Sequence, residues 1–461
     1  MKTILTHTYF IKEDPLEQKV MKPYPPLGLL YLSAWLKEHN KNVQVFDSTF
    51  SNRKKMFAHL EKENPDILGI HCNMMTKFVV LELIDFCRKN NIISILGGPD
   101  AATQIDEFLS YGADIIISGE GEETLLAVIN HLEKKEKNNL NEIANVSFKD
   151  QNGKIISTSR TSSKKQLDSF PFPDREAINL NLYLDAWHKH HSQRSLSIVT
   201  ARGCAFTCKW CSHSVYGFTH RRRKPEKVLE ELKMLIPKYK PTHLWYVDDV
   251  FTVNKHWLKH YARLLKEENI YLPFECIARG DRIDAEIVNI LKEMGCYRIW
   301  FGAESGSQKI LDAMSRGVTK EQIEKAVSLC RSAGIESGLF VMFGYPGETI
   351  ADINETIDFI SSIQPDNYLT TIAYPLRGTQ LFEEKSDDVY EHDWSRTIQR
   401  YLDMKQRFSG TLYRNAMQKL AYDYQRKKMI RLKKEFLKQT YYYVRSLYCQ
   451  FSISRLRNKR T

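Results

Sequence analysis

Short β-rich runs alternate with amphipathic helical runs along most of this chain, and that alternation restricts its fold more than any other feature. Within the first 130 residues the β-rich runs are Lys2–Thr8, Asn42–Thr49, Asp66–Asn73, Ile93–Asp100 and Asp114–Gly121. Strand–helix units in this order predict a parallel sheet covered by helices on both faces. We therefore expect a doubly wound, Rossmann-like domain over residues 1–140, with its ligands bound at the C-terminal ends of the strands.

A second series of strand–helix units follows a proline-containing stretch, residues 141–194, which we interpret as a linker. Its six β-rich runs are Ser195–Cys204, His243–Phe251, Pro273–Asp281, Tyr297–Ser307, Ser337–Thr349 and Tyr368–Thr379. Six repeats predict a partial, TIM-like (β/α)6 barrel over residues 195–390, with its active site at the C-terminal ends of the strands. The chain is therefore expected to be α/β throughout, except for a helical, basic region at residues 391–461.

Three of the nine cysteines, Cys204, Cys208 and Cys211, lie within eight positions of each other just after the first strand of that barrel. Three thiolates from one loop can bind three irons of a [4Fe–4S] cluster and leave the fourth iron open for a ligand. The alternative is a structural zinc site completed by His213. The other cysteines show no disulfide spacing and the N-terminus no signal-peptide pattern, so we expect a reducing, cytoplasmic location.

The loop Cys204-x3-Cys208-x2-Cys211, with Trp210 before its last cysteine, resembles the radical S-adenosylmethionine (SAM) superfamily. Later segments are similar, in the same order, to the cobalamin-binding branch of that superfamily; they read YVDDVF, CIARGDRID, GCYRIWFGAESGS, GYPGET and YPLRGTQLF. The N-terminal segments YPPLGLLYLSAWL, GGPD and GEGEET resemble the B12-binding domain of the same branch. The resemblance covers about residues 1–390.

The resemblance implies an enzyme with a [4Fe–4S] cluster, SAM and cobalamin, reduced by an electron donor such as flavodoxin or ferredoxin. The reaction it implies is methylation of an unactivated carbon, after a 5′-deoxyadenosyl radical has removed hydrogen from that carbon. A radical cyclisation of the anaerobic porphyrin-cyclase type, or a rearrangement, is the alternative within the same architecture. A non-catalytic B12- or zinc-binding sensor is the alternative from another class.

The resemblance also implies which residues contact SAM. The three cysteines would ligate the cluster, and the SAM contacts would be Trp210, Asp248, Asp249, Arg279, Glu304, Ser305, Gly344 and Ala373. In this assignment the aspartates bind the amino group, the arginine binds the carboxylate, Glu304 and Ser305 bind the ribose, and the others surround the adenine. Charged residues at a barrel mouth can equally form ion pairs with one another, which is the alternative for each of them.

The cobalamin contacts implied by the resemblance are Pro26, Gly28, Asn73, Gly97, Gly98, Gly119 and Glu120. Two departures from the pattern of B12 proteins bear on this assignment. The chain has no Asp-x-His-x-x-Gly run, whose histidine binds cobalt in many such proteins, and His71 does not fit that motif. Asp100 also stands where relatives commonly carry histidine. Cobalamin would then bind with no histidine on cobalt.

Residues 426–461 carry twelve Lys and Arg and one acidic residue, so they account for the whole net charge of +11. Because the rest of the chain is neutral overall, the charge argues against a general nucleic-acid-binding protein. Apolar and aromatic residues interleave with these cations at helical spacing. This pattern predicts a helix packed on the barrel or, alternatively, one that lies on an anionic membrane or faces nucleic acid. We expect a small-molecule or lipid-like substrate.

Overall fold

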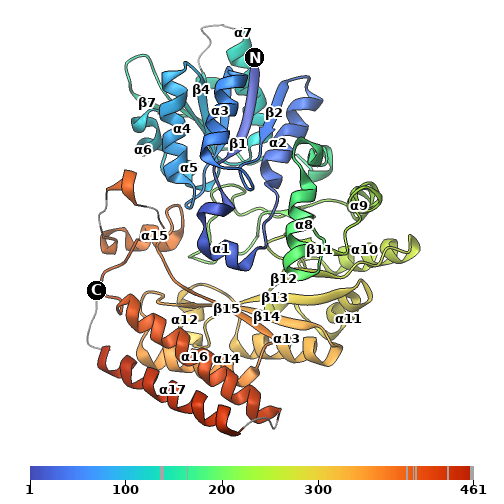
Figure 1. The fold of residues 1–461 in the computed structure, drawn as a ribbon, viewed down its shortest axis with the longest axis vertical. Coiled ribbons are helices and arrows are strands. Elements are labelled where there is room, and N and C mark those ends of the chain that lie inside the picture. Colours follow the sequence, from blue (N-terminus) through green and yellow to red (C-terminus); the bar gives the residue numbers. More distant parts are fainter. Residues whose placement is uncertain are drawn as a thin grey trace.

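The structure is a computed structural model that describes residues 1–134, 140–163, 165–390, 393–397, 399, 402–432 and 436–456. Two α/β units are stacked along the long axis, and helices of the C-terminal region lie at the far end of the second unit (Figure 1). The first unit is built on a seven-stranded sheet and the second on a six-stranded sheet. None of the described helices is long and apolar enough to cross a bilayer.

The sheet of the first unit begins with five parallel strands, as the sequence predicted. They are β1 (Lys2–His7), β2 (Asn42–Phe46), β3 (Ile67–His71), β4 (Ile93–Gly97) and β5 (Ile115–Ile117). Their order is β2-β1-β3-β4-β5, so successive connections run first to one side of β1 and then to the other. In a doubly wound sheet the ligand binds at this switch point, outside the C-terminal ends of the strands.

Two further strands extend this sheet past residue 140, where we expected the first domain to end. β6 (Val146–Lys149) pairs with β5, and β7 (Ile155–Ser157) pairs with β6, both in the antiparallel direction. The hairpin between them forms because the Asp150 carboxylate accepts hydrogen bonds from the amides two and four residues later, while Gly153 adopts a φ of 78°. Part of the expected linker is therefore one edge of the sheet.

Helices cover both faces of this sheet, which is why its strands are apolar along most of their length. Ile4 of β1 points to one face and its neighbour Leu5 to the other. The helices α2 (Leu27–Glu38) and α7 (Gly121–Lys134) pack on the face of Leu5. The face of Ile4 is covered by α3 (Arg53–Glu63), α4 (Lys77–Lys89), α5 (Pro99–Thr103) and α6 (Ile105–Tyr111).

The second unit contains the predicted partial barrel, with six parallel strands that neighbour one another in chain order. They are β8 (Ser195–Ile198), β11 (His243–Tyr246), β12 (Phe274–Ala278), β13 (Cys296–Glu304), β14 (Glu336–Phe343) and β15 (Asn367–Ile372). The helices between them are α9 (Pro225–Tyr239), α10 (Lys255–Glu267), α11 (Ala285–Glu293), α12 (Gln308–Ala313), α13 (Lys320–Ala333) and α14 (Ile350–Ile363). One large apolar core joins the strands to these helices.

The helix α13 shows how local sequence sets these boundaries. Thr319 and Gln322 form a reciprocal capping box at its start, and Gly334 ends it in the left-handed conformation, with a φ of 72°. On the buried face of the helix, Ile323 and Val327 join the barrel core.

The C-terminal region is more than a helical tail. The segment after α15 (Gln380–Lys385) returns to the first unit, where the Trp394 ring packs edge-on against Phe108 at a centroid distance of 4.9 Å. The chain then comes back to the barrel, and α16 (Gly410–Arg431) packs on α14. The helix α17 (Phe436–Leu456) packs along α16 (Figure 1). Residues 393–397 and 402–408 therefore pack against the two α/β units, where we had expected a separate region to begin.

Candidate active site

The cysteine loop is fixed at the barrel mouth by a short two-stranded ladder. β9 (Ala201–Arg202) pairs antiparallel with β10 (Arg221–Arg222), and the loop that carries the three cysteines leaves and returns through this pair. Gly203 follows β9 with a φ of 80°, and a Cβ there would lie 2.2 Å from the carbonyl oxygen of Thr219. A glycine before the first cysteine is therefore required for the loop to close.

Two arginines lie beside the sulfur of Cys208. Its Sγ is 3.9 Å from Nη1 of Arg279 and 3.6 Å from Nη1 of Arg316. Arg279 also stacks on the ring of Phe206, with its guanidinium carbon 3.7 Å from the ring centre. Burial, together with the neighbouring Cys208, raises the pKa of the Cys211 thiol to about 12. A bound metal would be needed to keep such thiols ionised, and the arginines would offset the negative charge.

No three His, Cys, Asp or Glu side chains in the described part of the chain already converge as metal ligands. The three thiols lie on one loop but are not drawn to a common point. The donor set nevertheless fits an iron–sulfur cluster, because three thiol side chains share one loop and two cations stand beside it. The zinc alternative would require the fourth ligand from His213. That ring packs at a tilt against Phe218, and its Nδ1 lies 3.2 Å from the Gly217 oxygen. Its Nε2 is buried and has no hydrogen-bond partner among the residues that the structure describes.

The structure separates the roles of the two neighbouring aspartates. Asp248 is buried, and its Oδ1 accepts hydrogen bonds from the amides of Thr200 and Ala201. Its Oδ2 accepts from the Thr200 hydroxyl and, at 2.9 Å, from Arg222. Four donors occupy the lone pairs of one carboxylate, so a ligand ammonium would have to displace one of them. Asp249, by contrast, opens into the cavity described below.

The residues expected to bind the SAM carboxylate and ribose lie at the ends of β12 and β13. Arg279 donates to the Arg316 carbonyl oxygen at 2.8 Å, in addition to its contact with the cysteine loop. Glu304 is buried at the end of β13 with a φ of 58°, and burial raises its pKa to about 7. The hydroxyl of Ser305 points away, to Thr356 of α14, at 2.9 Å. Glu304 and Ser305 were both expected to bind the ribose, but the hydroxyl of Ser305 is already used in the contact with α14.

Trp210 and Ala373, both expected near the adenine, lie in one small apolar cluster with Tyr345. The indole Nε1 of Trp210 is buried and has no hydrogen-bond partner in the part of the chain that the structure describes. Gly344 stands beside this cluster with a φ of 82°, and a Cβ there would lie 3.1 Å from the Tyr413 ring. An apolar pocket with an unused N–H donor suits an aromatic heterocycle with nitrogen acceptors.

Arg407, which the sequence analysis missed, holds this side of the barrel together. Its Nη1 donates to the carbonyl oxygens of Gly344, at 3.0 Å, and Ala373, at 2.5 Å. These two residues follow β14 and β15, so one guanidinium fixes the ends of both strands. No sequence signal identifies Arg407, because it lies 34 positions after Ala373 in a stretch that we assigned to the tail.

A cavity of about 460 Å³ lies between the two units at the C-terminal edge of the first sheet. Its walls are mostly apolar, and they include Gly28, Gly97, Gly98, Gly119 and Glu120 among the expected cobalamin contacts. Apart from its chain neighbours and the backbone of its own helix, no atom of the described residues lies within 4 Å of where a Cβ on Gly28 would stand, so the space beside it is open. The barrel supplies the opposite wall, which includes Val199, Gly203, Val247 and Asp249. The cavity therefore reaches from the first sheet to the residue before Cys204.

Two of the expected cobalamin contacts lie outside this lining. Pro26 begins α2, where its carbonyl oxygen accepts from the amides of the first turn. Asn73 shapes the turn before α4, since its Oδ1 accepts from the Met75 amide at 2.9 Å. Both residues position elements around the cavity without facing it.

Glu120 lines the cavity, but its carboxylate is paired with the cysteine-loop strands. Arg202 lies 2.9 Å from Glu120 and 2.7 Å from Glu122, and Arg221 also binds Glu120. The Arg202 guanidinium stands 4.6 Å over the ring of Tyr31. This buried network ties the end of the first sheet to the strands that hold the cysteine loop. No local sequence pattern points to this network, because residues 120 and 202 are far apart in the chain.

Each of the two units matches the sequence profile of a known family. The sequence profile of the radical SAM superfamily matches residues 198–360, and that of the B12 binding domain matches residues 17–129. An uncharacterized methyltransferase of Pyrococcus horikoshii is 28% identical over 382 residues, covering 80% of each chain. The anaerobic magnesium-protoporphyrin IX monomethyl ester cyclase of Cereibacter sphaeroides is 26% identical over 399 residues, which cover 81% of this chain and 62% of the cyclase.

The fold is also that of a solved structure. The radical SAM methyltransferase TsrM of Kitasatospora setae, with cobalamin and a [4Fe–4S] cluster bound, superposes with a TM-score of 0.69 at 18% identity. The match covers 84% of this chain and 78% of that one. The order of the two α/β units and the partial barrel are thus shared.

Proposed function

This chain is a radical SAM protein with an N-terminal B12-binding domain, and on that basis we propose that it methylates an unactivated carbon of a small-molecule substrate. The observation that carries the proposal is the shared cavity, whose walls come from the C-terminal edge of the B12-binding sheet and from the mouth of the barrel beside the cysteine loop. When bound, the cluster and SAM would supply a 5′-deoxyadenosyl radical, and cobalamin would supply the methyl group. Cys204, Cys208 and Cys211 would hold the cluster.

The residues of this chain would then position SAM. Asp249 is the candidate for its ammonium group, because Asp248 is already saturated by donors. Glu304, buried and without a hydrogen-bond partner among the described residues, is the candidate for the ribose hydroxyls. Trp210 would donate its unused N–H near the adenine, in the apolar cluster that contains Ala373. The apolar lining of the cavity would exclude water from reactive intermediates.

Anaerobic reconstitution tests this proposal. We expect about four iron and four sulfide per chain, retained cobalamin, and cleavage of SAM to 5′-deoxyadenosine when an electron donor such as flavodoxin or ferredoxin reduces the protein. Methyl-labelled SAM should transfer its label to the substrate product. SAM cleavage without label in the product would favour a radical cyclisation, as named for the cyclase relatives. About one zinc per chain and no SAM cleavage would overturn the enzyme proposal.

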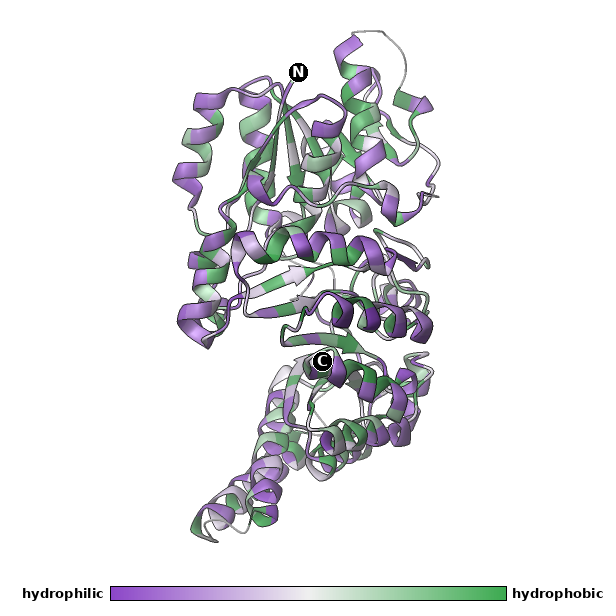
Figure 2. Cartoon of the chain, turned by 90° about the vertical axis from the view of Figure 1, so that its right-hand side faces the viewer, coloured by the Kyte–Doolittle hydropathy of each residue, from purple (hydrophilic) through white to green (hydrophobic). Residues whose placement is uncertain are grey.

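We also propose that α17 binds an anionic membrane surface, which would suit a lipid-like substrate. One face of α17 is buried on α16 through Cys449 and Ile453. Its other face exposes an apolar stripe at alternating spacings of four and three residues: Leu437, Tyr441, Val444, Tyr448 and Phe451, each more than half exposed. Hydrophobic and hydrophilic residues are interspersed along the two C-terminal helices (Figure 2).

The positive charge of the C-terminal segment supports the proposal that the apolar stripe binds a membrane and not a second copy of the chain. The segment 426–461 carries the entire +11 net charge of the protein. Two copies brought together through this stripe would repel each other, whereas anionic headgroups would attract it by about 1 kcal/mol per basic residue. Tyrosine and phenylalanine at the edge of a basic helix are typical of interfacial binding.

Flotation with vesicles tests the membrane proposal separately from the enzyme proposal. Wild-type protein should float with phosphatidylglycerol vesicles and not with phosphatidylcholine vesicles. The double variant Tyr448→Glu/Phe451→Glu should stay in the dense fraction. The matched control Met234→Glu/Tyr271→Glu, which alters two similarly exposed apolar residues elsewhere, should float like wild type. Equal behaviour of the two double variants, or no flotation of the wild type, would refute the membrane contact and leave the chemistry unaffected.

A further inference from the structure

His71 is the one residue in the described lining of the shared cavity with a neutral nitrogen or sulfur donor of the kind that binds cobalt. It is the last residue of β3, one of the two strands that flank the switch point of the first sheet. Its ring has no hydrogen-bond partner among the described residues. A Cβ placed on Gly98 would lie 3.0 Å from its Nε2, so only a glycine lets the chain pass this close to the ring.

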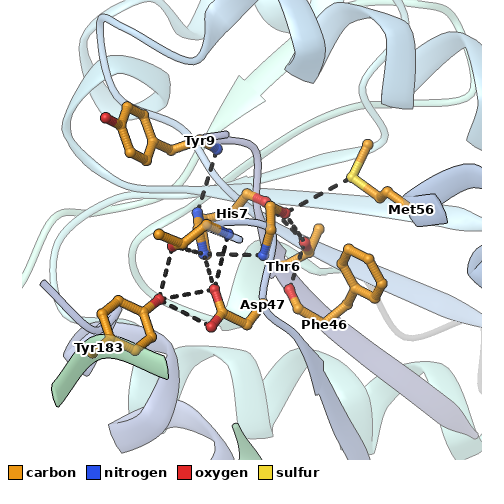
Figure 3. Close-up of polar contacts among 9 residues, drawn as sticks. Thr6, His7, Tyr9, Phe46, Asp47, Met56 and Tyr183 are labelled. Atoms are coloured by element: carbon orange, nitrogen blue, oxygen red, sulfur yellow. Dashed lines mark hydrogen bonds and ion pairs between the residues drawn. The ribbon is translucent and has the colours of Figure 1, made fainter. Parts of the chain in front are cut away.

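The other histidine at this edge of the sheet, His7 at the end of β1, is committed to a polar network (Figure 3). Its Nε2 lies 2.9 Å from Oδ1 of Asp47, and its Nδ1 accepts a hydrogen bond from the Tyr9 amide at 3.3 Å. Asp47 in turn accepts from the hydroxyl of Tyr183, on the helix that leads into the barrel, at 2.9 Å. Both nitrogens of His7 are therefore occupied, whereas those of His71 have no hydrogen-bond partner in the described part of the chain and can face a ligand.

Burial also keeps the imidazole of His71 neutral. It lowers the pKa of His71 to about 4, with a smaller contribution from His7. A neutral imidazole has the lone pair that metal coordination requires. The barrel wall opposite, with Val247 and Asp249, belongs to the SAM side of the cavity. A cofactor bound through the imidazole of His71 would therefore have its opposite face toward the cysteine loop.

We propose that the imidazole of His71 is the axial ligand of cobalt on the side of the B12-binding sheet. His71 would take the place of the histidine that an Asp-x-His-x-x-Gly loop supplies in other B12 proteins. The absence of that motif led us to expect cobalamin without a histidine on cobalt, and the proposal differs from that expectation. Ligation exchanges a water or the nucleotide base of cobalamin for the imidazole nitrogen and leaves the oxidation state of cobalt unchanged. The inference rests on the proposed function in one respect, because it needs cobalamin in this cavity.

Electron paramagnetic resonance of the cob(II)alamin-loaded full chain tests the proposal without measuring activity. An axial nitrogen splits the cobalt lines into triplets when it is ¹⁴N and into doublets when it is ¹⁵N. Protein grown with ¹⁵N-histidine should give doublets, which distinguishes a histidine from the unlabelled base of cobalamin. The variant His71→Ala should lose this splitting but keep cobalamin. The matched control His131→Ala, on the far end of α7, should retain it.

Several results of these experiments would contradict the His71 ligand. Triplets in the labelled protein, or a spectrum without nitrogen splitting, would overturn the His71 ligand while leaving the B12-binding proposal standing. Doublets that persist in His71→Ala would assign the bond to another histidine and also overturn it. A wild-type chain that retains no cobalamin after gel filtration would overturn this inference together with the use of cobalamin in the proposed function.

Discussion

Replacing Asp248 by asparagine should destabilise the barrel, whereas the same change at Asp249 should weaken SAM binding. In Asp248→Asn the side-chain carbonyl can still accept from the amides of Thr200 and Ala201, and the Thr200 hydroxyl can turn to accept from the new amide. Arg222 would lose its carboxylate partner, since the new NH2 group cannot accept its hydrogen bond.

The cost of that loss follows from the burial of Arg222. Removing one partner of a buried ion pair costs about 3 to 5 kcal/mol. Arg222 keeps a hydrogen bond to the Phe251 carbonyl oxygen and its place 4.4 Å over the Trp257 ring. We therefore expect the lower end, about 3 kcal/mol, in urea denaturation of the cluster-free full chain followed by tryptophan fluorescence.

Asp249→Asn should behave in the opposite way. Burial raises the pKa of Asp249, and the Asp248 charge raises it further, so removing its charge should change the free energy of unfolding by less than about 1 kcal/mol. Losing a charge-assisted hydrogen bond to an ammonium costs about 1.5 to 3 kcal/mol, or roughly 10- to 100-fold in the SAM dissociation constant. Equilibrium dialysis with the reconstituted protein measures this. Weak SAM binding with unchanged stability in Asp248→Asn would refute the division of roles.

Three further results are expected. Burial raises the pKa of Glu348 from 4.5 to about 8, so the folded chain keeps a proton that the unfolded chain releases, and the wild type loses stability as pH rises between those values. Paired denaturation curves should then show Glu348→Gln more stable than wild type by on the order of 4 kcal/mol at pH 8 and by little at pH 4.5. Replacing any loop cysteine by alanine should abolish iron loading measured by elemental analysis, whereas His213→Ala should retain it; loss of metal in His213→Ala would restore the zinc alternative. Arg202→Met should leave Glu120 and Glu122 without their shared partner, lower the free energy of unfolding by about 3 kcal/mol, and raise the cobalamin dissociation constant in spectroscopic titration.

The positions of the strands and helices could be read from sequence because they depend on local patterns. All five parallel strands of the first sheet lie within the predicted runs, and the six barrel strands match theirs except that β13, β14 and β15 each begin one residue earlier. The reason is that buried parallel strands require continuous apolar stretches. The capping box of Thr319 and the stop at Gly334 are equally local. The antiparallel pairing of β6 and β7 was not predicted, because short strands at a sheet edge have a weak pattern and their register depends on the neighbouring strand.

The two α/β units, the position of the cysteine loop after the first barrel strand and the number of its thiols all follow from the amino-acid sequence. The use of the charged residues depends on how distant segments pack together. Asp248 and Asp249 are adjacent in the chain, yet one is saturated by donors and the other opens into the cavity. Arg407 reaches the ends of β14 and β15 from outside the barrel. The physical reason is that apolar periodicity is a property of neighbouring residues, whereas the partner of a buried charge is set by packing between segments that are far apart in sequence.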